Sequence, residues 1–113
     1  MGTKKIMDKI TFEDFKNLDI RVGTVSSAEK IPETDKLLKL EVDFSEEKRQ
    51  IVSGIAENYT PDDIIGKQFP FILNLEPRTI RGVESNGMIL AVDDGKPVLL
   101  SPLEKVTNGS IVR

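Results

Sequence analysis

Apolar and polar residues alternate in two segments of the chain, which is the pattern of a β-strand with one buried face. The first segment runs from Leu38 to Phe44 and the second from Gln68 to Leu75. Shorter segments rich in apolar residues are also predicted to be strands: 20–26, 49–54, 88–92 and 98–100. The pattern therefore predicts five or six short strands.

Helical signals are short. Thr11 can cap a helix that ends near Leu18, with Asp14 at the offset of a capping box. The spacing of Phe12, Phe15 and Leu18 predicts that this helix covers one end of the core. A second short helix is expected between the third and fourth strands, at 55–59, and residues 77–86 are expected to form a polar loop. Because no strand alternates with a long helix, a small closed all-β barrel fits best.

Length and composition agree with this fold class. A chain of 113 residues suits one domain, which we place at 11–113 after a polar lead-in at 1–10. Ile and Val, with 12 and 9 residues, outnumber the 10 Leu, and β-branched side chains favour sheets. The apolar residues 98–100 and 111–112 form a C-terminal extension that exceeds the needs of a five-stranded barrel, which suggests a homodimer.

The chain contains no histidine and no cysteine. Ser-His-Asp and Cys-His catalysis are therefore excluded, and zinc or iron–sulfur sites lack their usual ligands. No phosphate-binding loop is present either, so we expect no catalytic residues, no metal and no cofactor. The absence of cysteine and the polar start predict a cytoplasmic protein, and no apolar run has the length of a membrane span.

The net charge of −3 argues against binding of nucleic acid by bulk positive charge. Several basic residues nevertheless fall on positions that the alternation assigns to the outside of the sheet, or directly after them: Arg21, Lys39, Arg78 and Arg81, with Asn74 beside them and Lys36 before the second strand. Small Greek-key barrels commonly bind nucleic acid across such a face. The alternative is that each cation is a solvated charge beside an acidic neighbour such as Glu41 or Glu76.

Five motifs follow one another along the chain: Leu18-Asp19-Ile20-Arg21-Val22-Gly23, Asp35-Lys36-Leu37-Leu38-Lys39-Leu40, Ser53-Gly54-Ile55, Asn74-Leu75-Glu76-Pro77-Arg78 and Glu84-Ser85-Asn86-Gly87-Met88-Ile89-Leu90. Together, in this order, they resemble the tRNA-binding domain appended to methionyl-tRNA synthetase. The resemblance extends from about Phe12 to Arg113. Similar domains occur as a free-standing bacterial tRNA-binding protein, a cytokine-like polypeptide and an export-related chaperone.

The resemblance implies a five-stranded Greek-key oligonucleotide-binding barrel that recognises the shape of tRNA rather than its sequence, usually as a homodimer. It also implies a set of tRNA-binding residues: Lys36, Asn74, Arg78, Arg81, Ser85 and Met88. The cations would contact phosphates, while Asn74 and Ser85 could reach sugar or backbone oxygens. Met88 begins an apolar strand, so a place in the core is the alternative for it.

The resemblance leaves two functions open. The first is a tRNA-recruiting module that acts beside a catalytic synthetase subunit, whether the chain is a separate β-subunit, a free-standing protein or an excised C-terminal domain. The second is a dimeric chaperone that binds unfolded peptides. The Asn-Gly-Met-Ile-Leu run at 86–90 departs from the chaperone pattern and favours the first.

Overall fold

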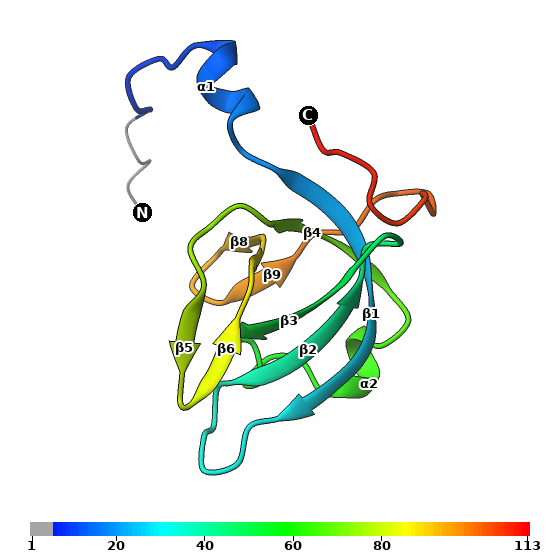
Figure 1. Cartoon of the computed structure of the whole chain (residues 1–113). Helices are drawn as coiled ribbons and strands as arrows, with labels where there is room; N and C mark the ends of the chain where they lie inside the picture. Colours follow the sequence, from blue (N-terminus) through cyan, green and yellow to red (C-terminus); the bar gives the residue numbers. More distant parts are fainter. Residues whose placement is uncertain (1–5) are drawn as a thin grey trace.

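A five-stranded antiparallel sheet, in the order β3-β2-β1-β4-β7, forms the body of the protein in this computed structural model, which describes residues 6–113 (Figure 1). Its strands are β1 (Ile20–Lys30), β2 (Leu38–Asp43), β3 (Lys48–Ser53), β4 (Gln68–Ile72) and β7 (Met88–Ile89). Strand β3 also contacts β7, so the sheet is nearly closed. The resulting order around the barrel is a Greek key, which confirms the predicted all-β, oligonucleotide-binding type of fold.

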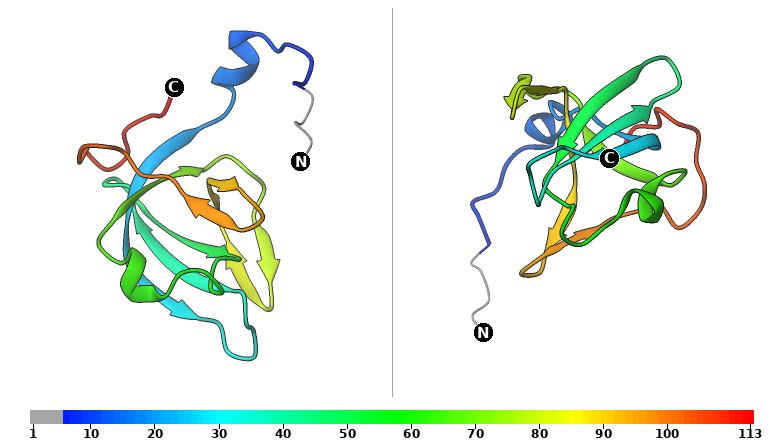
Figure 2. Two further views of the ribbon diagram at one scale, coloured as in Figure 1. Left: turned by 180° about the vertical axis from the view of Figure 1, so that it is seen from behind. Right: turned by 90° about the horizontal axis from the view of Figure 1, so that it is seen from below.

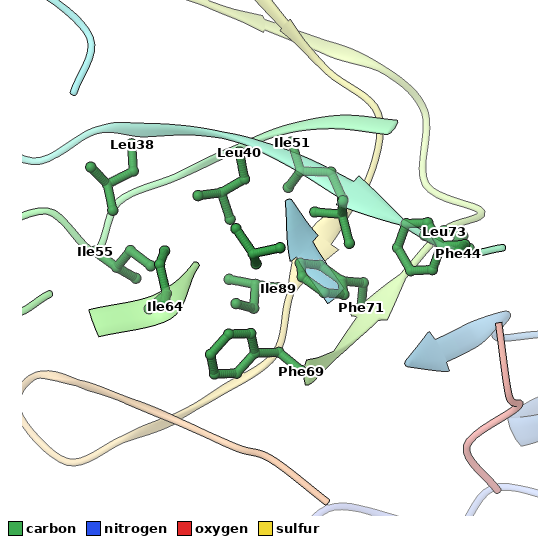
Figure 3. Close-up of a cluster of buried hydrophobic side chains, with 12 residues drawn as sticks. Leu38, Leu40, Phe44, Ile51, Ile55, Ile64, Phe69, Phe71, Leu73 and Ile89 are labelled. Atoms are coloured by element: carbon green, nitrogen blue, oxygen red, sulfur yellow. The ribbon is translucent and has the colours of Figure 1, made fainter. Parts of the chain in front are cut away.

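The apolar side chains on the inner faces of the strands fill the barrel. Leu38, Leu40 and Val42 on one face of β2 are fully buried, and they meet apolar side chains from β3, β4 and β7 (Figure 3). The Phe44 and Phe71 rings pack edge to face, with their centroids 5.5 Å apart. These contacts give the strands a rigid common core.

Two further hairpins extend from the barrel. Strands β5 (Arg78–Ile80) and β6 (Val83–Ser85) pair with each other, as do β8 (Ala91–Asp93) and β9 (Pro97–Leu99). The first hairpin corrects the sequence prediction, which expected an unpaired polar loop at 77–86. Strand β6 packs beside β3, so this hairpin lies against the barrel at the edge where the sheet closes.

The helices differ from the prediction in part. Helix α1 (Phe12–Lys16) begins at Thr11 with the predicted capping box. It does not cover the core, however: Phe12 is 62% exposed, Leu18 is 42% exposed, and the helix stands away from the barrel (Figure 1). The predicted helix between β3 and β4 exists, but it is α2 (Pro61–Ile64) rather than residues 55–59, which form turns.

The C-terminal extension runs back across the barrel, as the two views in Figure 2 show. Its last residues lie beside the first half of β1, where the Val22 amide donates to Ser110 O at 2.9 Å and the Val112 amide donates to Ile20 O at 2.8 Å. The extension is therefore part of the folded monomer, although Ile111 remains 50% exposed.

Part of the predicted lead-in, residues 1–5, lies outside the described residues, and residues 6–10 form neither helix nor strand. Within residues 6–113, no helix combines the length and the apolar character that a membrane span requires.

Candidate nucleic-acid interface

Two of the basic residues on the outer face of the sheet are paired with carboxylates. Arg21 Nε lies 2.8 Å from Asp19 Oδ1, and Lys39 Nζ lies 2.7 Å from Glu29 Oε1. The hydrogen bond and the charge of Asp19 raise the pKa of Arg21. For Arg21 and Lys39 the structure thus favours the alternative of a surface charge beside an acidic neighbour.

Arg78 and Arg81 lie on the β5–β6 hairpin. Both are exposed, and neither forms an ion pair within residues 6–113. Arg81 and Gly82 occupy the turn with φ values of 53° and 78°, the left-handed conformation that a tight two-residue hairpin requires. The two guanidinium groups are therefore presented to solvent by a short, paired element.

Ser85 holds this hairpin to the barrel. The side chain is 5% exposed; its hydroxyl accepts from the Val52 amide of β3 at 2.9 Å and donates to Gly87 O at 3.1 Å. Next to it, Gln50 Nε2 donates to Glu84 O at 2.8 Å. The hydroxyl of Ser85 is thus occupied inside the protein, and its predicted contact with RNA stays a prediction.

Asn74 is likewise occupied by the protein itself. Its Oδ1 accepts from the Asp19 amide at 2.9 Å, and its Nδ2 donates to Asn17 O at 2.6 Å. These bonds tie the end of β4 to the segment between α1 and β1. In the structure the side chain of Asn74 fastens this segment to the barrel, and a direct contact with a sugar or a phosphate stays a prediction for it.

Met88 and Lys36 are both exposed. Met88 is 44% exposed at the start of β7, so its alternative assignment to the core is wrong. Lys36 lies in the loop between β1 and β2 and forms no ion pair within the described part of the chain. This loop and the β5–β6 turn lie at the same end of the molecule in Figure 1 and in the rear view of Figure 2. Cations from two separate segments are therefore presented at one end of the barrel.

Sequence reasoning missed Arg49, which lies at the base of the β5–β6 hairpin. Its Nη1 donates to Leu73 O at 2.6 Å and to Asn86 O at 3.3 Å, and its Nε donates to Glu47 at 2.9 Å. The carbonyl partners are 24 and 37 residues away along the chain. No local pattern could have indicated them.

The exposed groups suit binding of a phosphate backbone. Free guanidinium and ammonium groups bind phosphates without reading bases. No row of exposed aromatic side chains accompanies them on β5, β6 or the β1–β2 loop, so stacking of single-stranded bases is not supported. Within residues 6–113, no three acidic, histidine or cysteine side chains gather as metal ligands.

Comparison with known proteins gives the same class of function. The family model described as "Putative tRNA binding domain" matches residues 20–111. The methionine–tRNA ligase of Archaeoglobus fulgidus is 52% identical over 93% of this chain, and that of Parabacteroides distasonis is 49% identical over 97%. The chain spans only 16% of the length of each ligase.

Solved structures of similar length share the fold. A MetRS-related protein from Pyrococcus horikoshii matches with a TM-score of 0.89 and 42% identity, over 95% of this chain and all of that one. The chaperone CsaA of Bacillus anthracis matches with a TM-score of 0.84 and 34% identity, over 94% of this chain and all of that one. Because the family model covers most of the chain and the relatives are this similar, the chain belongs to the tRNA-binding domain family that is also found within methionine–tRNA ligases.

Proposed function

We propose that the chain is a non-catalytic, sequence-independent tRNA-binding module that contacts the phosphate backbone through Arg78, Arg81 and Lys36. The observation that carries this proposal is the pair of arginines on the β5–β6 hairpin, exposed and free of ion pairs within the described residues. With a net charge of −3, the distant field of the protein repels RNA. Affinity then depends on short contacts made within about one Debye length, ~8 Å at physiological salt.

The module would recruit tRNA to a catalytic synthetase subunit in the cytoplasm. The similarity to a part of methionine–tRNA ligases supports this role. A binding module raises the effective concentration of tRNA near the catalytic site without performing the reaction. The lack of histidine and cysteine supports a non-catalytic role.

A homodimer is part of the proposal. Phe12 is 62% exposed and Leu18 is 42% exposed. Leu18 lines a small groove with Phe15, Ile111 and Val112, and the charged residues Lys16, Asp19 and Arg113 border the same groove. Exposed apolar side chains at this end of the molecule favour self-association. Light scattering at micromolar concentration should give twice the chain mass, and a monomer mass would contradict this part of the proposal.

Filter binding with unfractionated tRNA tests the main function. We expect the protein to retain tRNA on the filter, and single-stranded homopolymer RNA to be a poor competitor. Arg78→Ala should retain less tRNA than Lys105→Ala, because Lys105 lies away from the hairpin, in the lining of the cavity beside α2. An unfolded polypeptide competitor tests the chaperone function, which the likeness to CsaA favours. Displacement of tRNA by the peptide, or retention of the peptide alone, would support the chaperone and contradict the main proposal.

A further inference from the structure

Arg49 lies where the segment that carries the two exposed arginines leaves the barrel and returns to it. This segment, residues 74–86, is called the arm below; it begins after Leu73 and ends at Asn86. Nη1 of Arg49 donates to the carbonyl oxygen of Leu73 at 2.6 Å and to that of Asn86 at 3.3 Å. One guanidinium group therefore joins both ends of the arm to β3.

The rest of the guanidinium is held by Glu47 in the turn before β3. Nε and Nη2 of Arg49 both lie 2.9 Å from Glu47 Oε1. Because all three nitrogens are occupied within the protein and the charge is paired, Arg49 is poorly suited to bind a phosphate. A planar guanidinium can serve one carboxylate and two carbonyls at once, which a lysine ammonium on a flexible stem cannot do with the same geometry.

Within residues 6–113, the other contacts between the arm and β3 lie at its second end, while Asn74 ties the first end to the segment between α1 and β1. The hydroxyl of Ser85 accepts from Val52, and the Asn86 amide donates to Gln50 O at 2.9 Å. Of the contacts that join the arm to β3, the Arg49 guanidinium is the one that reaches the first end, at Leu73. Removal of this contact would leave the first end of the arm without a side-chain bond to β3, while the second end keeps its bonds to Val52 and Gln50.

We propose that Arg49 and Glu47 form a clamp that fixes the orientation of the arm, and that tRNA affinity depends on this clamp although neither residue touches RNA. This inference rests on the proposed function, because the arm matters to affinity only if Arg78 and Arg81 bind phosphates. A pre-oriented arm engages both arginines without the entropic cost of ordering the segment during binding. Arg49 is thus a positioning residue.

Glu47→Gln tests the clamp because the clamp and simple electrostatics predict opposite changes in the affinity for tRNA. Removal of a negative charge from the protein would, by simple electrostatics, tighten the binding of an anion. The clamp predicts the opposite, about threefold weaker tRNA binding, because the charge-assisted bonds that hold Arg49 are weakened. Glu46→Gln is the matched control: it removes the same charge from the adjacent residue, which makes no side-chain hydrogen bond or ion pair within residues 6–113. Tighter binding by both variants would overturn the clamp.

Arg49→Lys tests whether the effect passes through the arm. We expect about tenfold weaker tRNA binding although the charge is retained, comparable to the loss of one charge-assisted hydrogen bond. In a protein that already carries Arg78→Ala and Arg81→Asn, the same substitution should cost less than about twofold, because residues that act as a unit are not additive. An equal loss in both proteins would mean that Arg49 contacts RNA itself, and would overturn the proposal.

Hydrogen exchange separates failure of the clamp from failure of the proposed function. In both Glu47→Gln and Arg49→Lys, amides at 74–86 should exchange faster while those of β2 stay protected. If the unmutated protein does not retain tRNA, the proposed function fails, yet the exchange measurement still tests the clamp. Unchanged exchange at 74–86 would overturn it, and Glu47→Gln keeps the test available if Arg49→Lys does not fold.

Discussion

Arg78 pairs with Ser85 across the β5–β6 hairpin, so the exposed guanidinium is carried directly opposite the hydroxyl that fastens the hairpin to β3. Ser85 is buried while Arg78 is exposed. One residue of this pair therefore attaches the hairpin to the barrel, and the other carries the exposed positive charge. The position of the Arg78 charge thus depends on the hydrogen bond between Ser85 and β3.

Ser85→Ala should lower stability by about 1–3 kcal/mol, because the buried Val52 N–H would lose its hydrogen-bond partner. It should also weaken tRNA binding with little change in the dependence on salt, since a neutral hydroxyl releases no counterion. Urea denaturation followed by filter binding measures both effects. Ser27→Ala, at an exposed position of β1, is the control and should change neither. Unchanged stability in Ser85→Ala would contradict the conclusion that Ser85 fastens the hairpin to β3.

Removal of a cation that binds a phosphate should reduce the slope of log affinity against log salt by about one unit. We expect this for Lys36→Ala, Arg78→Ala and Arg81→Asn. Asparagine is chosen at position 81 because the φ of 53° disfavours most side chains but tolerates asparagine. A salt titration of filter binding with unfractionated tRNA gives the slopes.

The controls for this titration are Lys39→Ala and Lys105→Ala. Lys39 is already paired with Glu29 at 2.7 Å, and Lys105 lines a different cavity, beside α2. Both variants should keep the slope of the unmutated protein. If Lys105→Ala lowers the slope as much as Arg78→Ala does, the binding is diffuse rather than located on the hairpin.

The hydrogen bonds of Asp63 at the start of α2 should make the stability of the protein depend on pH. Its carboxylate accepts from the Thr60 amide at 2.7 Å and from the Thr60 hydroxyl at 3.1 Å, and these bonds lower the pKa of Asp63 below its ordinary value. A lowered pKa in the folded state means that this stabilisation is complete above the ordinary pKa and is lost as the pH falls through the lowered one. Asp63→Asn should therefore be less stable than the unmutated protein at neutral pH, and the difference should shrink in acid. Thermal melting between about pH 2 and pH 7 measures it, and a difference that does not vary with pH would contradict this account.

The strands of the barrel could be predicted because one physical condition, a single buried face, produces a period of two. Leu38, Leu40 and Val42 show this period and are fully buried. The β5–β6 hairpin lacks it: its strands are short, and most of their residues are exposed. Its turn at Arg81 and Gly82 also differs from the Asn-Gly type that usually marks a tight hairpin. The sequence therefore predicts a loop for these residues.

Helix α1 shows a second limit of the sequence. The spacing of Phe12 and Phe15 correctly places their rings near each other, with centroids 6.3 Å apart, but a shared face does not show what covers it, and Phe12 is 62% exposed. In the candidate site, the sequence alone was enough to indicate which positions carry a basic side chain. It could not distinguish Arg21, which Asp19 neutralises at 2.8 Å, from Arg78, which has no such partner within the described chain. That distinction depends on side-chain geometry, as does the role of Arg49.

Asn74→Ala should loosen the connection between α1 and β1. The amide side chain bonds to the Asp19 amide at 2.9 Å and to Asn17 O at 2.6 Å, so its removal frees the segment at both points. Hydrogen exchange should accelerate at 17–19 while β2 remains protected. The affinity for tRNA should fall with little change in the salt slope, because a neutral amide displaces no counterion.

Asn74→Asp separates the two hydrogen bonds. A carboxylate still accepts from the Asp19 amide but cannot donate to Asn17 O, so exchange at 17–19 should lie between that of the unmutated protein and that of Asn74→Ala. Asn58→Ala, at an exposed position whose side chain makes no hydrogen bond within residues 6–113, is the control and should leave exchange and affinity unchanged. If Asn74→Ala weakens tRNA binding while exchange at 17–19 stays the same, Asn74 acts on RNA directly and the positioning role is wrong. If exchange accelerates and affinity does not change, the segment that Asn74 holds is separate from the binding surface.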